Sequence, residues 1–148
     1  MTTLEARFAV DGWDDRPVPG LSGEWFGTIE MRKTFTSGLV GTSVALFVSS
    51  GDIEGQRSYF AAERITASLA ADGGQGSAGQ GRADQGGAEQ GSAEQGSVTV
   101  HHGGLESAPD SWFGHVVPGS GTGPFAGWSG PARIIHDESG PYFAFEVG

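Results

Sequence analysis

The chain has 148 residues, no cysteine, and 18 acidic against 8 basic side chains, which give a formal net charge of −10. This length fits one domain with one core, and the lack of cysteine excludes disulfides and thiol chemistry. The few basic residues are scattered, which argues against a nucleic-acid partner because phosphate binding needs clustered Lys and Arg. Apolar runs are short and no basic, apolar leader opens the chain, so we expect a cytoplasmic protein that does not enter a membrane.

Short β-branched and aromatic runs separated by glycine predict an all-β chain. Residues 4–10 alternate apolar and charged side chains, which is typical of a half-buried strand, whereas the prolines and glycines of residues 11–24 predict a loop. Further strands are predicted over residues 26–36, 42–49, 58–69, 98–102, 111–117, 128–136 and 142–147. About eight strands with regular turn signals indicate an antiparallel sandwich or barrel.

Residues 72–97 form a low-complexity, Gly/Gln-rich segment in which glutamine returns every fifth residue. A collagen-like helix needs glycine at every third position. A β-solenoid needs a larger apolar residue in each turn than the alanine that recurs here. Gly, Ser, Gln and acidic residues do not offset an ordering cost of about 1–2 kcal/mol per residue. We therefore predict one barrel domain over residues 1–148, with residues 72–97 as a disordered insertion at the tip of a hairpin.

Four stretches outside that segment resemble the motifs of a known family. They read KTFTSGLVGTS at residues 33–43, ERITASL at 63–69, SVTVHH at 97–102 and VVPGSGTG at 116–123. The family is a group of small bacterial proteins of unknown function, and the resemblance implies their antiparallel allene oxide cyclase-like β-barrel. GTGPFAG at residues 121–127 is also similar to a bend in dirigent proteins and allene oxide cyclases, where glycines would turn the chain and Phe125 would plug the barrel end.

Ionisable side chains stand in phase with apolar residues on two predicted strands. Glu63 shares a face with Tyr59 and Ile65, and His102 shares a face with Val100. Such groups inside an apolar barrel can act as a coupled proton donor and acceptor. We therefore predict Glu63, His102 and Tyr59 as catalytic residues, with a structural hydrogen bond, or an ion pair between Glu63 and an arginine, as the alternative.

The predicted hairpin suggests how these groups meet. If Leu69 faced Val98 across the insertion, Ile65 would face His102. Glu63 would then be the diagonal neighbour of His102, at about 7–8 Å between Cα atoms and within side-chain reach.

Apolar residues in the inward phase are predicted to line a ligand cavity, or alternatively to fill a plain core. The predicted ligand-binding set is Phe8, Ile29, Met31, Phe35, Ile65, Val100, Trp112 and Phe143. No metal is expected, because His101 and His102 are adjacent on one strand and point to opposite faces.

These observations predict a cofactor-free barrel protein that acts on a small hydrophobic molecule. The resemblance to cyclase barrels suggests an isomerase or cyclase of secondary metabolism. The alternatives are a non-catalytic binder of a small hydrophobic ligand and a structural module with a filled core. Exposed aromatic residues such as Trp25 and Trp128 would favour a homo-oligomer.

Overall fold

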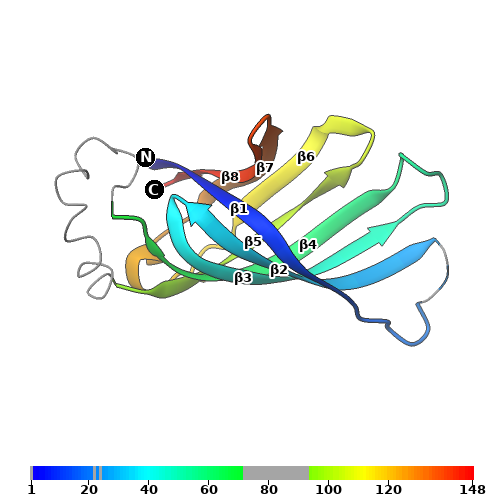
Figure 1. Cartoon of the computed structure of the whole chain (residues 1–148), viewed down its shortest axis with the longest axis horizontal. Helices are drawn as coiled ribbons and strands as arrows, with labels where there is room; N and C mark the ends of the chain where they lie inside the picture. Colours follow the sequence, from blue (N-terminus) through cyan, green and yellow to red (C-terminus); the bar gives the residue numbers. More distant parts are fainter. Residues whose placement is uncertain (1, 22, 24, 72–93) are drawn as a thin grey trace.

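A computed structural model describes residues 2–21, 23, 25–71 and 94–148. The described residues form eight antiparallel strands, which close into a barrel in sequence order as β8 pairs with β1 (Figure 1). The strands are β1 (Thr2–Asp15), β2 (Phe26–Ser37), β3 (Leu39–Ser50), β4 (Ser58–Leu69), β5 (Gly96–Leu105), β6 (Ala108–Val116), β7 (Gly130–Asp137) and β8 (Gly140–Val147). This confirms the predicted all-β antiparallel barrel. Over the same residues, no helix has the length and hydropathy to span a membrane.

β1 is longer than predicted, because residues 11–15 continue the strand. A bulge between Val10 and Gly12 keeps the ladder going, so that Trp13 pairs with Met31. Pro17 and Gly20, on which the loop prediction rested, both lie after the last residue of the strand, Asp15. The bulge adds one residue to β1, which bends the strand without ending its pairing with β2.

β5 also begins earlier than predicted. Gly96 is buried and pairs with Ala67, so Gly96 and Ser97 belong to the barrel and not to the insertion. The backbone N–H of Ser97 donates to the side-chain oxygen of Thr122, which holds the start of the strand. Within the predicted disordered segment, residues 72–93 lie outside the described residues.

The register between β4 and β5 differs from the predicted one by four residues along β4. Ile65 faces Val98 and Ala61 faces His102. Leu69 instead pairs with Leu39 of β3, beyond the last β4–β5 pair. Because the shift is an even number of residues, every side chain keeps its face. Glu63 is still a diagonal neighbour of His102, on the opposite diagonal.

One end of the barrel is filled with apolar side chains. The termini, the turn between β2 and β3, and the segment between β6 and β7 gather at this end, and the turns that follow β3 and β5 lie towards the other (Figure 1). The one-turn 3-10 helix η1 (Gly123–Phe125) carries Phe125, which is fully buried and packs edge-on against Trp128. Phe125 therefore fills the barrel end, as predicted, and any ligand site has to lie towards the opposite end.

Substitution of Gly38 tests how tightly the backbone packs at the end of the barrel that is filled with apolar side chains. Its φ is 83°, and a Cβ added to it would lie 2.2 Å from the backbone carbonyl oxygen of Glu5. We expect Gly38→Ala to lower the free energy of unfolding by at least about 2 kcal/mol, since left-handed strain and a backbone clash act together. Urea denaturation measures the loss. Gly55→Ala is the matched control, because Gly55 has the same φ and nothing within 4 Å of an added Cβ. Equal losses in the two variants would show that the contact with Glu5 is not tight.

Candidate functional site

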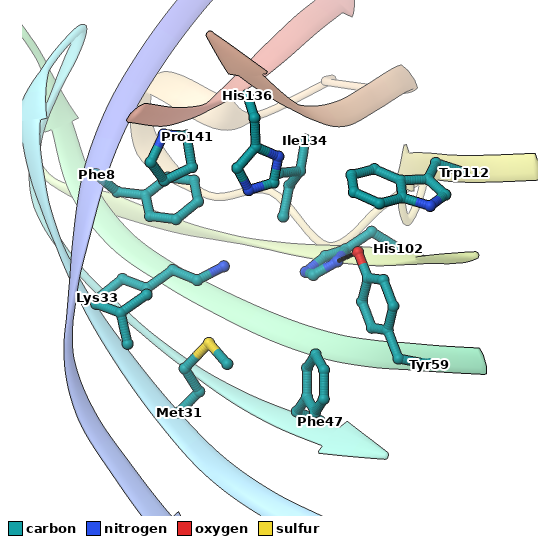
Figure 2. Close-up of a pocket in the computed structure, with 11 residues that line it drawn as sticks. Phe8, Met31, Lys33, Phe47, Tyr59, His102, Trp112, Ile134, His136 and Pro141 are labelled. Carbon is teal, nitrogen blue, oxygen red and sulfur yellow. Dashed lines mark hydrogen bonds between the residues drawn. The ribbon is translucent and has the colours of Figure 1, made fainter. Parts of the chain in front are cut away.

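The open end of the barrel holds a cavity of about 230 Å³, and every strand contributes to its wall (Figure 2). The wall is mostly apolar, with a few polar groups from separate strands. The lining residues are Phe8, Val10, Met31, Lys33, Phe47, Tyr59, His102, Trp112, Ile134, His136 and Pro141. A concave apolar site with a few convergent polar groups is the usual form of a small-molecule site.

Small residues beside His102 leave room for the cavity. In the cross-strand row that crosses the barrel at this level, Phe47 pairs with Ala61, Ala61 with His102, and His102 with Gly114. A Cβ on Gly114 would lie 2.0 Å from the backbone oxygen of Ala132, so only glycine fits where β6 approaches β7. The large imidazole ring of His102 therefore stands between an alanine and a glycine.

A buried polar network lies behind the cavity wall and centres on Glu63. One carboxylate oxygen, Oε1, accepts hydrogen bonds from Lys33 Nζ and from His102 Nε2, both at 2.8 Å. The other oxygen, Oε2, accepts from the hydroxyl of Ser43. Glu63, Lys33, Ser43 and His102 come from four different strands, and each is 3% exposed or less.

Tyr59 extends this network to the cavity. Its hydroxyl lies 3.3 Å from His102 Nδ1. An ionised carboxylate only accepts hydrogen bonds, so His102 Nε2 carries a proton towards Glu63. In the neutral ring Nδ1 is then the acceptor, and the hydroxyl of Tyr59 donates to it.

Burial and the network together set the protonation states. Burial raises the pKa of Glu63, but the hydrogen bond from His102 and the positive charge of Lys33 outweigh it and hold the pKa at about 2. Burial lowers the pKa of His102 despite the opposing effect of Glu63, so the ring is neutral at pH 7. Burial, with a further contribution from the charge of Glu63, raises the pKa of Tyr59 to about 12. Tyr59 therefore keeps its proton and Glu63 keeps its charge.

Aromatic contacts fix the cavity wall. Phe47 stacks on Tyr59 with 4.8 Å between ring centroids, and Trp112 stands perpendicular to Tyr59 at 6.4 Å. The indole N–H of Trp112 donates to the backbone oxygen of Leu105 at 2.7 Å. Lys33 Nζ lies 4.3 Å from the ring centroid of Phe8. These contacts tie the lining residues to one another and to the backbone.

Comparison with solved structures gives the barrel a counterpart. The chain is similar to a protein of unknown function from the DUF3224 family of Shewanella oneidensis MR-1, with a TM-score of 0.71 and 21% sequence identity. The match covers 100% of this chain and 96% of that chain. The fold is that of a barrel from an uncharacterised family. No protein-family model matches the chain, and no curated protein matches it. Because a shared fold does not give a function, the function has to be argued from the site.

The structure brings the three predicted catalytic residues together. Tyr59 and His102 line the cavity, whereas Glu63 lies behind the wall and bonds to His102. The ion-pair partner of Glu63 is Lys33, where an arginine was the predicted alternative. The catalytic role of the three residues stays a prediction.

The predicted ligand-binding residues fall into three groups. Phe8, Met31 and Trp112 line the cavity. Ile29 is partly buried and pairs with Phe47, a lining residue. The others pack into the apolar core, and these are Phe35, Ile65, Val100 and Phe143.

Sequence reasoning missed Lys33, although a signal for it was present. Lys33 stands between Met31 and Phe35 in the alternating pattern of β2, so it occupies an apolar phase just as Glu63 does on β4. His136 and Phe47 were missed as lining residues because nothing in their sequence surroundings sets them apart. The prediction that His101 and His102 point to opposite faces of β5 is confirmed. His102 is buried, whereas His101 is exposed and its ring centroid lies 5.8 Å from that of His115.

Proposed function

We propose that the barrel binds a small hydrophobic molecule in the cavity at its open end. The observation that carries this proposal is an apolar cavity of about 230 Å³ that borders the polar pair Tyr59 and His102. Cavities for drug-sized ligands measure about 300–1,000 Å³, so the occupant is smaller than these. A structural module has no need for such a cavity, nor for the desolvation cost of a buried ion pair beside it.

Different lining residues would contact the apolar and the polar parts of the ligand. Phe8, Phe47 and Trp112 offer flat apolar surfaces to the body of the ligand. Tyr59 and His102 offer a hydroxyl and an imidazole to its polar group, such as a carbonyl or hydroxyl oxygen. Glu63 is a positioning residue, because it holds the ring of His102 and the ammonium of Lys33 without lining the cavity.

A second candidate function is a cofactor-independent isomerase or cyclase, and the neutral state of His102 favours it. His102 would take a proton from a carbon beside a carbonyl group and return it to another carbon, which rearranges the double bond with no change in composition. Tyr59 would turn its hydroxyl proton from His102 Nδ1 to the carbonyl oxygen, which frees Nδ1 to act as the base and stabilises the negative charge that develops on that oxygen. The sequence resemblance to allene oxide cyclases and dirigent proteins points to the same class by analogy of fold.

Trp112→Ala tests the binding proposal. A library of small apolar compounds is screened by thermal shift and native mass spectrometry, and hits are ranked by dissociation constant. We expect hits to bind at least about tenfold more weakly to Trp112→Ala, because one aromatic wall is lost. Trp25→Ala is the matched control, since Trp25 is exposed and does not line the cavity. Equal affinities in the two variants, or a library without hits, would contradict the proposal.

His102→Asn separates the two candidate functions. For an enzyme, turnover of a hit compound falls by about 10²–10⁴-fold. Failure of the wild-type protein to convert any hit would leave the binder as the function.

A further inference from the structure

The cavity wall has the opposite charge character to the rest of the chain. The chain carries 18 acidic and 8 basic side chains. The 11 lining residues include Lys33, His102 and His136 and no Asp or Glu. Glu63, the acid behind the wall, is 1% exposed and its oxygens accept three hydrogen bonds. A ligand therefore meets hydrogen-bond donors and no carboxylate.

Lys33 has donors left for a ligand. An ammonium group has three N–H donors, and in the described part of the chain one of them bonds to Glu63. Figure 2 shows the ammonium pointing from the β2 wall into the cavity, on the side towards His102. Lys33 and Tyr59 lie on either side of the His102 ring, as Figure 2 shows. One oxygen of a ligand carboxylate can therefore accept from Lys33 and the other from Tyr59.

The charges around Glu63 balance when the cavity is empty. Its carboxylate is compensated by Lys33, and His102 is neutral. An anionic ligand would therefore bring an uncompensated charge into a site of low dielectric constant. A proton on His102 Nδ1 would restore the balance, because Nε2 already donates to Glu63 and the imidazolium would then have a partner at both nitrogens.

We propose that the cavity takes a small planar carboxylic acid as its anion, held by Lys33 and Tyr59, while one proton is taken up at His102. This deepens the proposed function and rests on it. Phe47 lies parallel to Tyr59 and Trp112 stands perpendicular to it, so a flat ligand can stack on one of these rings while its edge meets the other, which selects a planar body. The carboxylate uses the remaining donors of Lys33. Binding is coupled to pH through the added proton.

The titratable groups that face His102 are few. β4 contributes Tyr59 and Glu63, and β2 contributes Lys33. β7 contributes His136, across the same cavity, and His101 lies next in the chain on the outer face. β6 and β8 contribute the non-titratable rings of Trp112 and Phe143. Tyr59 keeps its proton and Glu63 its charge near neutral pH, so the proton goes to one of the cavity histidines.

Calorimetric titration of the whole protein with benzoate tests the proposal, with benzamide as the neutral isostere. Titrations in buffers of different ionisation enthalpy give the number of protons taken up. We expect about one proton per benzoate, and an affinity that falls by up to about tenfold per pH unit between about pH 6 and pH 8. Benzamide is expected to bind at least about tenfold more weakly, without proton uptake.

Histidine variants locate the proton. His102→Asn is expected to abolish the uptake, whereas His136→Asn and the outer-face control His101→Asn retain it. Nitrogen NMR of the wild-type imidazoles gives a second readout that does not depend on the folding of any variant. Addition of benzoate should move the His102 Nδ1 resonance to its protonated position.

Each contrary result has a distinct meaning. Equal binding of benzoate and benzamide without proton uptake overturns this inference and leaves the proposed function standing. Uptake that is lost in His136→Asn but kept in His102→Asn overturns the assignment to His102. If neither probe binds, the inference is overturned, and the compound screen decides whether the proposed function falls with it.

Discussion

Glu63→Gln is expected to lower the free energy of unfolding by roughly 3–5 kcal/mol, because it removes the counter-charge of a buried cation. Lys33 is 2% exposed, and in the described part of the chain its ammonium group donates a hydrogen bond to Glu63. The amide of glutamine keeps one acceptor oxygen where the carboxylate offered two oxygens to three donors. Urea denaturation of both proteins at neutral pH measures the difference.

A double variant distinguishes the effect of breaking the ion pair from the effect of altered packing on the free energy of unfolding. Replacing the cation as well, in Lys33→Met/Glu63→Gln, leaves an amide that still accepts from His102 or Ser43 and removes the unpaired charge. We expect this double variant to be more stable than Glu63→Gln, because replacing a buried ion pair costs less than breaking it. The two substitutions are therefore strongly non-additive.

Glu30→Gln is the matched surface control. Glu30 also lies on a strand and forms ion pairs with Arg16 and Arg32, but these groups are partly exposed. Its loss should cost about 1 kcal/mol or less, since solvent screens such pairs. A loss in Glu63→Gln no larger than that in Glu30→Gln would contradict a tightly coupled buried network.

The strands were predictable because a barrel imposes a period of two on every strand. Inward positions such as Ile65 and Phe143 alternate with less buried ones along β4 and β8, and the alternation of side-chain types in the sequence reflects this. The same period identified Glu63 and His102 as inward polar residues. The face of the sheet on which a side chain lies depends only on whether its position in the strand is odd or even. The predicted inward orientation of Glu63 and His102 was therefore correct although the predicted β4–β5 register was wrong by four residues.

The β4–β5 register and the ion-pair partner of Glu63 could not be predicted from the sequence pattern. The register across residues 70–95 depends on where pairing ends, and this is set by contacts with other segments, such as that between Ser97 and Thr122. Barrel closure brings Lys33 of β2 to Glu63 of β4 across the intervening strand β3. Nothing local in either strand specifies that pair. The cavity likewise depends on which end of the barrel Phe125 fills, and that follows from tertiary packing.

Acid is expected to destabilise the protein in two stages, the first at His102 and the second at Glu63. Burial lowers the pKa of His102 below its ordinary value of 6.5. As the pH falls below 6.5, the unfolded chain gains a proton at this residue before the folded protein does, so the free energy of unfolding decreases. This contribution is present above pH 6.5 and is lost as the pH falls through the folded pKa of His102.

The second stage belongs to Glu63, whose pKa in the folded protein is about 2 against an ordinary value of 4.5. The stability that its charge contributes is complete above pH 4.5 and is lost as the pH falls towards 2, and the difference corresponds to roughly 3 kcal/mol. Urea denaturation at a series of pH values measures both stages. The gap in stability between the wild type and Glu63→Gln should narrow by a similar amount between pH 4.5 and 2, since protonated Glu63 and glutamine are both uncharged. A gap that stays constant over this range would show that the Glu63 carboxylate is not held ionised by Lys33 and His102.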